Sequence, residues 1–248
     1  MKNFLSGFKD EKIPLVEIFQ SISGEGVSVG NVVTFVRVAG CDLRCTWCDT
    51  KYSFKTSGEG IEQLLPDQII ERLNNLGPKE IICTGGEPLE HNKSKRYLPA
   101  YLQSKGFNVR IETSGGSNVY SEEELTGFDL NSTTRPVYTM DIKCPASRMD
   151  SKNIFDNIEL LDKRDELKFV AADEQDLSYS MDVIEKNKEH LANNQITLNF
   201  SPVFESLKRV DLVGFMIKNN EYFQSQSLKA RMSLQIHKFI WPPHQRGV

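Results

Sequence analysis

The chain has 248 residues and a formal net charge of −4, with 30 lysine and arginine residues against 34 aspartate and glutamate residues. Its composition, 39% hydrophobic and 26% charged, excludes a disordered or fibrous chain. The acidic balance argues against a nucleic-acid-binding face, which needs clustered lysine and arginine. No apolar run approaches the roughly 18 residues of a membrane-spanning helix, and charges interrupt the N-terminal segment too early for a signal peptide. We therefore expect a cytoplasmic protein with no membrane partner and no direct nucleic-acid partner.

Apolar, β-branched runs that alternate with helix-like stretches set the predicted elements in chain order. Strands are predicted over residues 31–38, 80–84, 108–112, 137–142, 167–170, 195–200 and 232–236. Helices are predicted over residues 66–76, 97–105, 180–191 and, more weakly, 153–164. Pro66 suits the first turn of the first helix, and Gly77 ends it. The apolar residues that share one face of this helix are Ile69, Ile70, Leu73 and Leu76.

The alternation of strands and helices predicts the fold class. Strand–helix–strand units imply right-handed crossovers and a mainly parallel sheet. We expect an α/β fold in which this sheet closes into a partial (β/α)6-type barrel. No repeat, low-complexity tract or linker divides the chain, so residues 1–248 are interpreted as one domain. Ligands bind at the C-terminal edge of the strands in parallel α/β folds, and the chemistry is expected there.

Three of the five cysteines lie close together in a C-x3-C-x2-C pattern, at Cys41, Cys45 and Cys48. An odd number of cysteines without an export signal argues against a disulfide framework. Three thiolates on one loop can hold three irons of a cubane iron–sulfur cluster, and the fourth iron is then open to an external ligand. Structural zinc is the alternative, but it usually takes four protein ligands. Cys83 is interpreted as a core residue, and Cys144 has no assigned role.

The cysteine spacing, with Trp47 just before the last cysteine, resembles the radical S-adenosylmethionine (SAM) superfamily. In that superfamily a [4Fe-4S] cluster binds SAM at its open iron and cleaves it to a 5′-deoxyadenosyl radical, so the cofactors carry the chemistry. The segment 84–88, Thr-Gly-Gly-Glu-Pro, resembles the one that holds the amino group of SAM. Its glycines permit close backbone approach, and the Glu87 carboxylate can accept hydrogen bonds from an ammonium group.

Further segments are similar to the 7-carboxy-7-deazaguanine synthase family. They are residues 17–26, 35–41, 48–50, 235–238 and 246–248. The resemblance implies a radical SAM lyase that converts 6-carboxy-5,6,7,8-tetrahydropterin to 7-carboxy-7-deazaguanine and releases ammonia, in the biosynthesis of queuosine-type 7-deazapurines. It also implies dependence on Mg²⁺, a homodimer, and a reductant such as flavodoxin.

The resemblance assigns roles to individual residues. The cluster ligands would be Cys41, Cys45 and Cys48, and Thr50 would place a hydroxyl on Mg²⁺, which prefers oxygen ligands. The residues expected to hold SAM are Trp47, Gly86, Ser114, Asp141, Lys143 and Ser201. Those expected to bind the pterin are Ile22, Ser23, Gly24, Arg37, Thr84 and Val248, with Arg37 as a two-pronged donor to its carboxylate. Many family members carry Ser-Pro-Lys where this chain has Asp-Ile-Lys at 141–143, so the ribose contact is expected to differ, with Glu112 as the alternative acceptor.

Two questions stay open at the level of sequence. Residues 241–248 contain two prolines that restrict the backbone, and they either fold over the site or form a disordered tail. For the function, the Asp-Ile-Lys segment is also reminiscent of glycyl-radical-enzyme activases. A zinc-binding interaction module is the alternative outside enzymes.

Overall fold

The computed structural model describes residues 5–243 and 245–248, so residues 1–4 of the predicted domain and residue 244 of the predicted tail lie outside it. Its centre is one sheet in the order β3-β1-β2-β4-β5-β6-β7-β8-β9, nine strands in the described part of the chain. The strands are β1 Ile13–Ile22, β2 Val32–Val38, β3 Glu62–Leu64, β4 Glu80–Gly85, β5 Asn108–Thr113, β6 Val137–Ile142, β7 Glu166–Ala171, β8 Thr197–Pro202 and β9 Lys229–Met232. The α-helices are α1 Leu5–Phe8, α2 Pro66–Leu76, α3 Leu98–Ser104, α4 Glu122–Thr126, α5 Glu174–Asn193, α6 Arg209–Lys218, α7 Asn220–Ser225 and α8 His237–Ile240.

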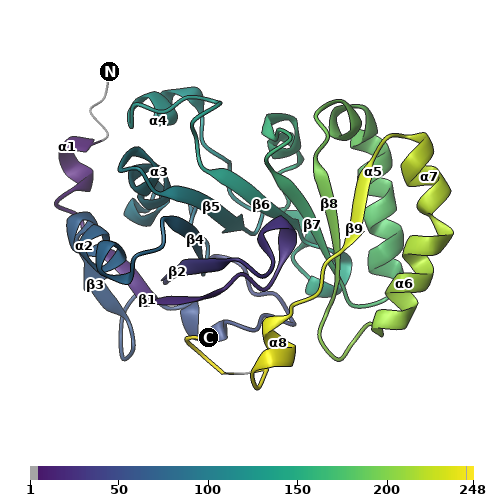
Figure 1. Ribbon diagram of the computed structural model, residues 1–248, viewed down its shortest axis with the longest axis horizontal. Helices are drawn as coiled ribbons and strands as arrows, with labels where there is room; N and C mark the ends of the chain where they lie inside the picture. The colour runs from purple at the N-terminus through teal and green to yellow at the C-terminus, as the bar shows by residue number, and fades with distance from the viewer. Residues whose placement is uncertain (1–4, 244) are drawn as a thin grey trace.

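Most of the sheet is parallel. Neighbouring strands from β2 to β9 run parallel, whereas β1 pairs antiparallel with β2 and with β3. Helices α5, α6 and α7 cover the outer side of the sheet near β7, β8 and β9 (Figure 1). The sheet order ends at β3 and β9 rather than joining them, so the barrel is open within the described residues. The predicted α/β class, with a mainly parallel sheet in a partial barrel, is confirmed. No helix among the described residues is long and apolar enough to cross a membrane.

The last predicted strand, residues 232–236, is wrong. Strand β9 pairs with β8 only up to Met232, opposite Phe200. Beyond it, the Ser233 amide still donates to the Phe200 carbonyl at 2.8 Å, but the Ile236 amide donates to the Gly24 carbonyl at 3.0 Å. The alternating pattern of this segment therefore marks a crossing toward the loop after β1, which sequence periodicity does not distinguish from a strand. The sequence also missed β1 and the short β3.

Helix α2 shows which parts of a helix prediction survive folding. It begins at Pro66, as predicted, and Gly77 ends it with a φ of 99°, a conformation that favours glycine. Ile69 and Leu73 are fully buried, but Leu76, which was predicted on the same face, is 36% exposed. The helix has already left the core at its last residue.

The inner side of the barrel is polar, because charged residues alternate with apolar ones along β7. Leu167 and Phe169 are fully buried in the core, and the Phe169 ring stacks on Phe200 at 5.4 Å. The alternate residues of the strand, Glu166 and Lys168, are also buried. The Glu166 carboxylate accepts a hydrogen bond from the Val27 amide at 2.9 Å and thereby ties the loop after β1 across the barrel.

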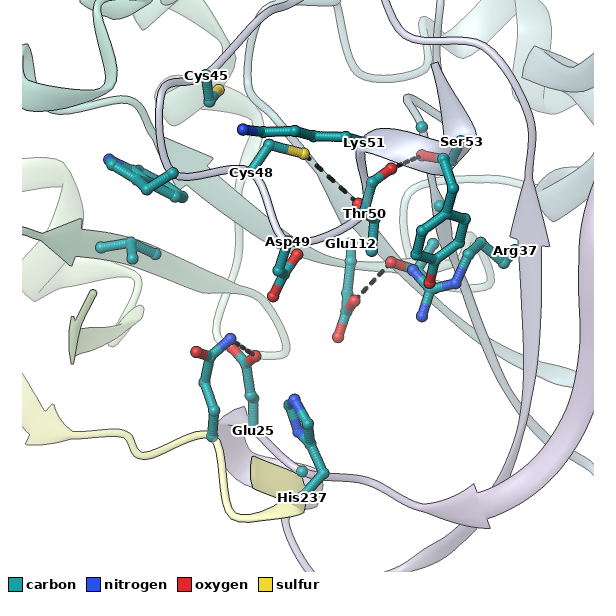
Figure 2. A pocket seen from close by; sticks show the side chains of 18 of the residues that line it. Glu25, Arg37, Cys45, Cys48, Asp49, Thr50, Lys51, Ser53, Glu112 and His237 are labelled. Atoms are coloured by element: carbon teal, nitrogen blue, oxygen red, sulfur yellow. Dashed lines mark hydrogen bonds between the residues drawn. The ribbon is translucent and has the colours of Figure 1, made fainter. Parts of the chain in front are cut away.

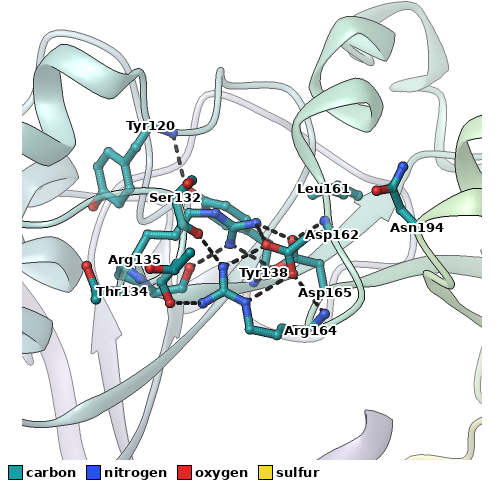
Figure 3. Close-up of polar contacts among 12 residues, drawn as sticks. Tyr120, Ser132, Thr134, Arg135, Tyr138, Leu161, Asp162, Arg164, Asp165 and Asn194 are labelled. Atoms are coloured by element: carbon teal, nitrogen blue, oxygen red, sulfur yellow. Dashed lines mark hydrogen bonds and ion pairs between the residues drawn. The ribbon is translucent and has the colours of Figure 1, made fainter.

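A second polar network joins the loops that precede β6 and β7, at the other end of the strands (Figure 3). Arg135 donates two parallel hydrogen bonds to the Asp165 carboxylate, at 3.1 and 2.6 Å. The same carboxylate accepts from the Tyr138 amide at 2.7 Å and from the Asp162 amide at 2.8 Å. The Arg135 and Asp165 side chains are 5% and 0% exposed, so each charge depends on its partner.

Replacing Arg135 with methionine is therefore expected to lower the free energy of unfolding by about 3–5 kcal/mol, because it leaves a buried carboxylate without its counter-ion. Urea unfolding of the purified protein measures the change. The matched control is Lys188→Met, which breaks an exposed ion pair with Glu185 and is expected to leave the free energy of unfolding nearly unchanged. Equal losses in the two variants would contradict the structural role of Arg135.

Candidate functional site

A cavity of about 500 Å³ lies at the C-terminal ends of the parallel strands. The cysteine loop that follows β2 forms one side of it, and residues 24–25 and the segment from residue 235 onward form the opposite side. Figure 2 shows Cys45 and Cys48 across the cavity from Glu25 and His237. The predicted edge of the sheet is therefore the edge where side chains from distant parts of the chain meet.

The three predicted cluster ligands all line this cavity. Cys41, Cys45 and Cys48 are partly exposed and free of disulfide bonds. Arg44 closes the loop on itself, since its guanidinium donates to the carbonyls of Cys41 at 2.6 Å and Leu43 at 2.7 Å. Burial raises the pKa of the Cys41 thiol to about 12 and also raises that of Cys45.

The donor chemistry fits an iron–sulfur cluster. Partial burial disfavours the thiolate form of Cys41 and Cys45, whereas metal ligation favours it. Cluster binding would therefore release protons from these two thiols. Among the described residues, no three histidine, cysteine, aspartate or glutamate side chains are arranged to hold a single metal ion. Within the loop, the Trp47 indole nitrogen is buried without a hydrogen-bond partner in the described structure. A buried donor of this kind is expected to bond to a ligand when one is present.

The Gly-Gly-Glu-Pro segment packs directly against the start of the cysteine loop. The Gly86 amide donates to the Val38 carbonyl at 2.9 Å, and the Glu87 amide donates to the Gly40 carbonyl at 2.8 Å. A Cβ on Gly86 would lie 1.9 Å from the Gly40 carbonyl oxygen. Only glycine therefore allows this approach, and the two loops form one unit.

The Glu87 carboxylate, which was predicted to accept hydrogen bonds from a ligand ammonium, accepts them from protein groups instead. It is fully buried and accepts hydrogen bonds from the Leu89 amide at 2.8 Å, the Thr113 hydroxyl at 2.8 Å and the Ser114 amide at 2.7 Å. The carboxylate thus joins the end of β4 to the end of β5. It positions Ser114, which lines the cavity, and is already committed to protein donors.

A chain of alternating charges crosses the floor of the cavity. The Lys168 ammonium lies 2.7 Å from Glu25 and 3.3 Å from Asp141, and Asp141 in turn lies 2.8 Å from the Lys143 ammonium. Burial opposes the charge on Lys168, but its carboxylate partners outweigh burial and raise its pKa well above the usual value. Burial also opposes the charge on Glu25 and by itself would raise its pKa. Lys168 and a hydrogen bond from Gln235 outweigh burial, so the pKa of Glu25 is lowered.

Two groups in the cavity lining are shifted toward their neutral forms. Burial raises the pKa of Glu112, although Lys168 opposes the shift, and the Thr84 hydroxyl donates to its carboxylate at 2.7 Å. Burial lowers the pKa of His237, although Glu25 opposes the shift. The cavity therefore offers a carboxyl group and an imidazole that are both poised to exchange protons.

Aromatic and charged side chains gather around Arg37 on one wall. Arg37 donates through Nε to Glu17 at 2.8 Å, and the Tyr52 hydroxyl donates to the same carboxylate at 3.4 Å. The Arg246 guanidinium lies 4.0 Å from the centre of the Tyr52 ring. This contact brings the C-terminal segment to the cavity, where Val248 is part of the lining.

The cavity gathers nearly all of the predicted site residues. Those in its lining are Ile22, Gly24, Arg37, Cys41, Cys45, Trp47, Cys48, Thr50, Thr84, Gly86, Ser114, Asp141, Lys143 and Val248. Ser23 and Ser201 are 2% and 1% exposed and lie outside the lining. The Ser23 hydroxyl donates to the Glu25 carbonyl at 3.2 Å, whereas the Ser201 hydroxyl has no partner in the described structure.

Sequence reasoning missed several lining residues, among them Glu25, Asp49, Lys168 and Lys238. Lys168 carried a usable signal, because a lysine inside an apolar strand run needs a buried partner. Asp49 and Lys238, which form an ion pair at 3.1 Å, carried none, because they lie far apart in the sequence.

Comparison with known proteins agrees with this geometry. The model of the radical SAM superfamily matches residues 35–128. The 7-carboxy-7-deazaguanine synthase of Clostridium acetobutylicum is 34% identical over 94% of this chain and 98% of the relative. That of Koribacter versatilis is 32% identical over 94% of this chain and 99% of the relative. The crystal structure of QueE from Escherichia coli superposes with a TM-score of 0.68 at 19% identity, over 94% of this chain and 98% of that one, and this likeness concerns the fold.

The open parallel barrel and the cysteine loop at its C-terminal edge define a radical SAM protein. Within that class, similarity over nearly the whole length places the chain more narrowly. The chain belongs to the 7-carboxy-7-deazaguanine synthase family.

Proposed function

We propose that this protein is a radical SAM lyase that converts 6-carboxy-5,6,7,8-tetrahydropterin to 7-carboxy-7-deazaguanine with release of ammonia, a step in the biosynthesis of queuosine-type 7-deazapurines. One observation carries the proposal: the three free cysteines of one loop share a cavity with a set of buried and partly buried acid, base and charge-pairing groups. The activase alternative is not favoured, because the relatives that match over the whole chain are named as synthases.

Cys41, Cys45 and Cys48 would ligate a [4Fe-4S] cluster, which together with SAM supplies the radical that removes a hydrogen atom from the pterin. The proposed SAM-binding role of Gly86 is supported by its packing. Because Gly86 has no side chain, its backbone lies directly against the start of the cysteine loop. The Lys143 ammonium lies over the Trp47 ring, 5.6 Å from the ring centre. Asp141 and Lys143 already pair with each other, so SAM would have to share or open this ion pair.

Arg37 is the group best suited to the carboxylate of the pterin. Glu17 takes only its Nε, and the planar guanidinium retains other donors. Burial opposes the charge on Arg37, but Tyr52 and Glu17 outweigh burial and raise its pKa, so the guanidinium stays charged. Ile22, Gly24 and Thr84 complete the proposed wall around the pterin.

Glu112 and His237 are proposed to handle protons in the rearrangement that follows hydrogen removal. The raised pKa of Glu112 favours a protonated carboxyl group, and the lowered pKa of His237 favours a neutral imidazole. A carboxyl group whose pKa is raised toward neutral pH can act as an acid, and an imidazole that stays neutral can act as a base. Release of ammonia needs a proton on the departing nitrogen, which a neutral carboxyl group can give.

Mg²⁺ is proposed to bind beside Thr50, whose hydroxyl lies 3.6 Å from the Cys48 sulfur at the end of the cysteine loop. Mg²⁺ retains several water or substrate oxygens in its shell, so one hydroxyl and a substrate carboxylate are a suitable pair of ligands. A homodimer and a small redox protein such as flavodoxin as the electron donor complete the proposal.

The test is anaerobic reconstitution with iron and sulfide, followed by incubation with SAM, a reductant and the carboxylated pterin. We expect 7-carboxy-7-deazaguanine by mass spectrometry, in larger amount with Mg²⁺ than without it. Cys45→Ala is expected to form none, whereas Cys144→Ala, at a buried cysteine outside the cavity lining, is expected to retain the activity. A reconstituted enzyme that cleaves SAM but leaves this pterin unchanged would refute the substrate.

Removal of residues 246–248 tests the proposed role of the C-terminal segment as a cover over the substrate. We expect a roughly tenfold rise in KM for the pterin, the size of one lost contact to a charged group. SAM cleavage in the absence of pterin should stay unchanged, because the contact of Arg246 is with Tyr52 on the proposed substrate side. An unchanged KM would show that the segment lies at the cavity without serving it.

A further inference from the structure

A buried lysine outside the cavity lining holds the chain directly before the first cysteine. Lys95 belongs to the short 3-10 helix Ser94–Tyr97, which precedes α3. Its side chain is 1% exposed. A lysine is almost never buried so completely unless its charge is paired. The partners of this ammonium therefore indicate what the residue does.

The Lys95 ammonium donates hydrogen bonds to two consecutive backbone carbonyls, those of Ala39 at 2.9 Å and Gly40 at 2.5 Å. The Gly40 carbonyl also accepts from the Glu87 amide at 2.8 Å. The peptide group that joins Gly40 to Cys41 is therefore held from two directions, by a side chain of one segment and by the backbone of another.

The Lys95 ammonium also packs directly against Gly40. The φ of Gly40 is 91°, which favours glycine. A Cβ at this position would lie 2.8 Å from the Lys95 nitrogen and 2.6 Å from a methyl group of Thr56. The ammonium thus occupies the space directly against the residue that starts the cysteine loop.

Glu90 supplies the counter-charge. Its carboxylate lies 2.6 Å from the Lys95 nitrogen, and its side chain is 17% exposed. The ammonium of this ion pair contacts Gly40, the residue directly before the proposed cluster ligand Cys41. Both charges would act on the cluster through a medium of low dielectric constant. Charges and hydrogen bonds around an iron–sulfur cluster set its reduction potential.

We propose that Lys95 is a positioning residue for the iron–sulfur cluster: it fixes the peptide from which Cys41 extends and, balanced by Glu90, sets the charge that the cluster experiences. The inference rests on the proposed cluster function of the cysteine loop. It assigns a role in that function to two residues that contact neither substrate nor cofactor.

The proposal makes the effects of the two partners opposite in sign. Lys95→Met removes a positive charge and should make the midpoint potential of the cluster more negative, because the added electron is less well stabilised. Glu90→Gln leaves the ammonium unbalanced and should make the potential less negative. The double variant should return near the wild-type potential. The Ala39 and Gly40 carbonyls still lack their hydrogen bonds from the ammonium, so its response to SAM should stay weakened.

The experiment is a redox titration of the reconstituted protein, followed by electron paramagnetic resonance without any pterin, with the SAM-induced change in the spectrum as a second readout. Lys93→Met is the matched control, since Lys93 is exposed and lies two positions away. A wild-type protein that takes up no cluster would refute the proposed function itself, whereas the outcomes below concern Lys95 alone.

Opposite shifts of the two single variants, with no shift in the control, would support the proposal. Shifts in the same direction, or none beyond that of Lys93→Met, would overturn it. If Lys95→Met fails to fold or to hold iron, Glu90→Gln decides, because it keeps the ammonium and both carbonyl hydrogen bonds: a less negative potential supports the proposal, and an unchanged one refutes it.

Discussion

Lys168→Met is expected to abolish measurable turnover and to lower the free energy of unfolding by about 3–5 kcal/mol at neutral pH, because it removes the buried ammonium that two partly buried carboxylates share. In the described structure the ammonium lies 2.7 Å from Glu25 and 3.3 Å from Asp141. Without it, Glu25 retains a hydrogen bond from Gln235 but no cation in contact, since Lys143 lies against Asp141. The two carboxylates then repel each other across the cavity floor.

The loss of stability should depend on pH in a direction that follows from the carboxyl groups. In the wild-type protein the pKa of Glu25 is lowered from its usual 4.5, so the folded state favours the ionised carboxylate and loses this stabilisation as pH falls. Without Lys168, burial is left to raise the pKa of Glu25, and folding then favours the protonated form. The difference between wild type and variant should accordingly be smallest well below about pH 4.5, where the wild-type protein loses the stabilisation by ionised Glu25, and should widen as the pH rises through and above that value.

Urea unfolding of the apo-protein at several pH values measures this effect without cofactors. Lys163→Met is the control: Lys163 is exposed in the turn before β7, and its replacement should change the free energy of unfolding by less than about 0.5 kcal/mol. A Lys168→Met variant whose stability deficit is constant with pH would show that the charge of Lys168 is not what holds the two carboxylates. Its turnover, measured on folded protein, then reports the role in the site separately.

The same lysine illustrates what the sequence could and could not predict. The cysteine loop was predictable because its ligands follow one another within residues 41–48, so local spacing carries the chemistry. The Gly-Gly-Glu-Pro segment was predictable for the same reason. Lys168 and Glu25, in contrast, are 143 positions apart, and Gln235 and Glu25 are 210 apart. Only the folded sheet and its loops bring these residues together, and no periodicity in the sequence predicts that.

The fold shows the same division between local and distant determinants. Strands β4 to β8 were predicted within two residues, because each is an apolar run with defined ends. The segment 232–236 was misread, because its amide at Ile236 pairs with the Gly24 carbonyl, not with the next residue of a neighbouring strand. Glu87 was given a ligand role because its motif is local, whereas its actual partners, Thr113 and Ser114, belong to the next strand end.

Gly86→Ala is expected to reduce SAM cleavage roughly 100-fold or more, although it adds only one methyl group. The new Cβ would lie 1.9 Å from the Gly40 carbonyl oxygen and 3.2 Å from the Cys41 amide nitrogen. Both are backbone atoms, so no side-chain rotation can relieve the overlap. Ordinary contact begins near 3.4 Å, and the two loops must therefore separate by about 1.5 Å. Displacements of about 1 Å in a catalytic arrangement cost about 100-fold in rate.

The readouts for Gly86→Ala separate a displaced loop from a failure to fold. Iron content after reconstitution and the SAM-induced spectral change should both fall, while the thermal unfolding of the apo-protein should change far less, because the core beneath β4 is untouched. Gly214→Ala is the matched control: nothing lies within 4 Å of a Cβ added there, and alanine is the better helix former in α6. A Gly86→Ala protein with wild-type iron content and turnover would mean that the cysteine loop can move by this distance and still bind SAM productively, and the close packing of the two loops would then have no part in catalysis.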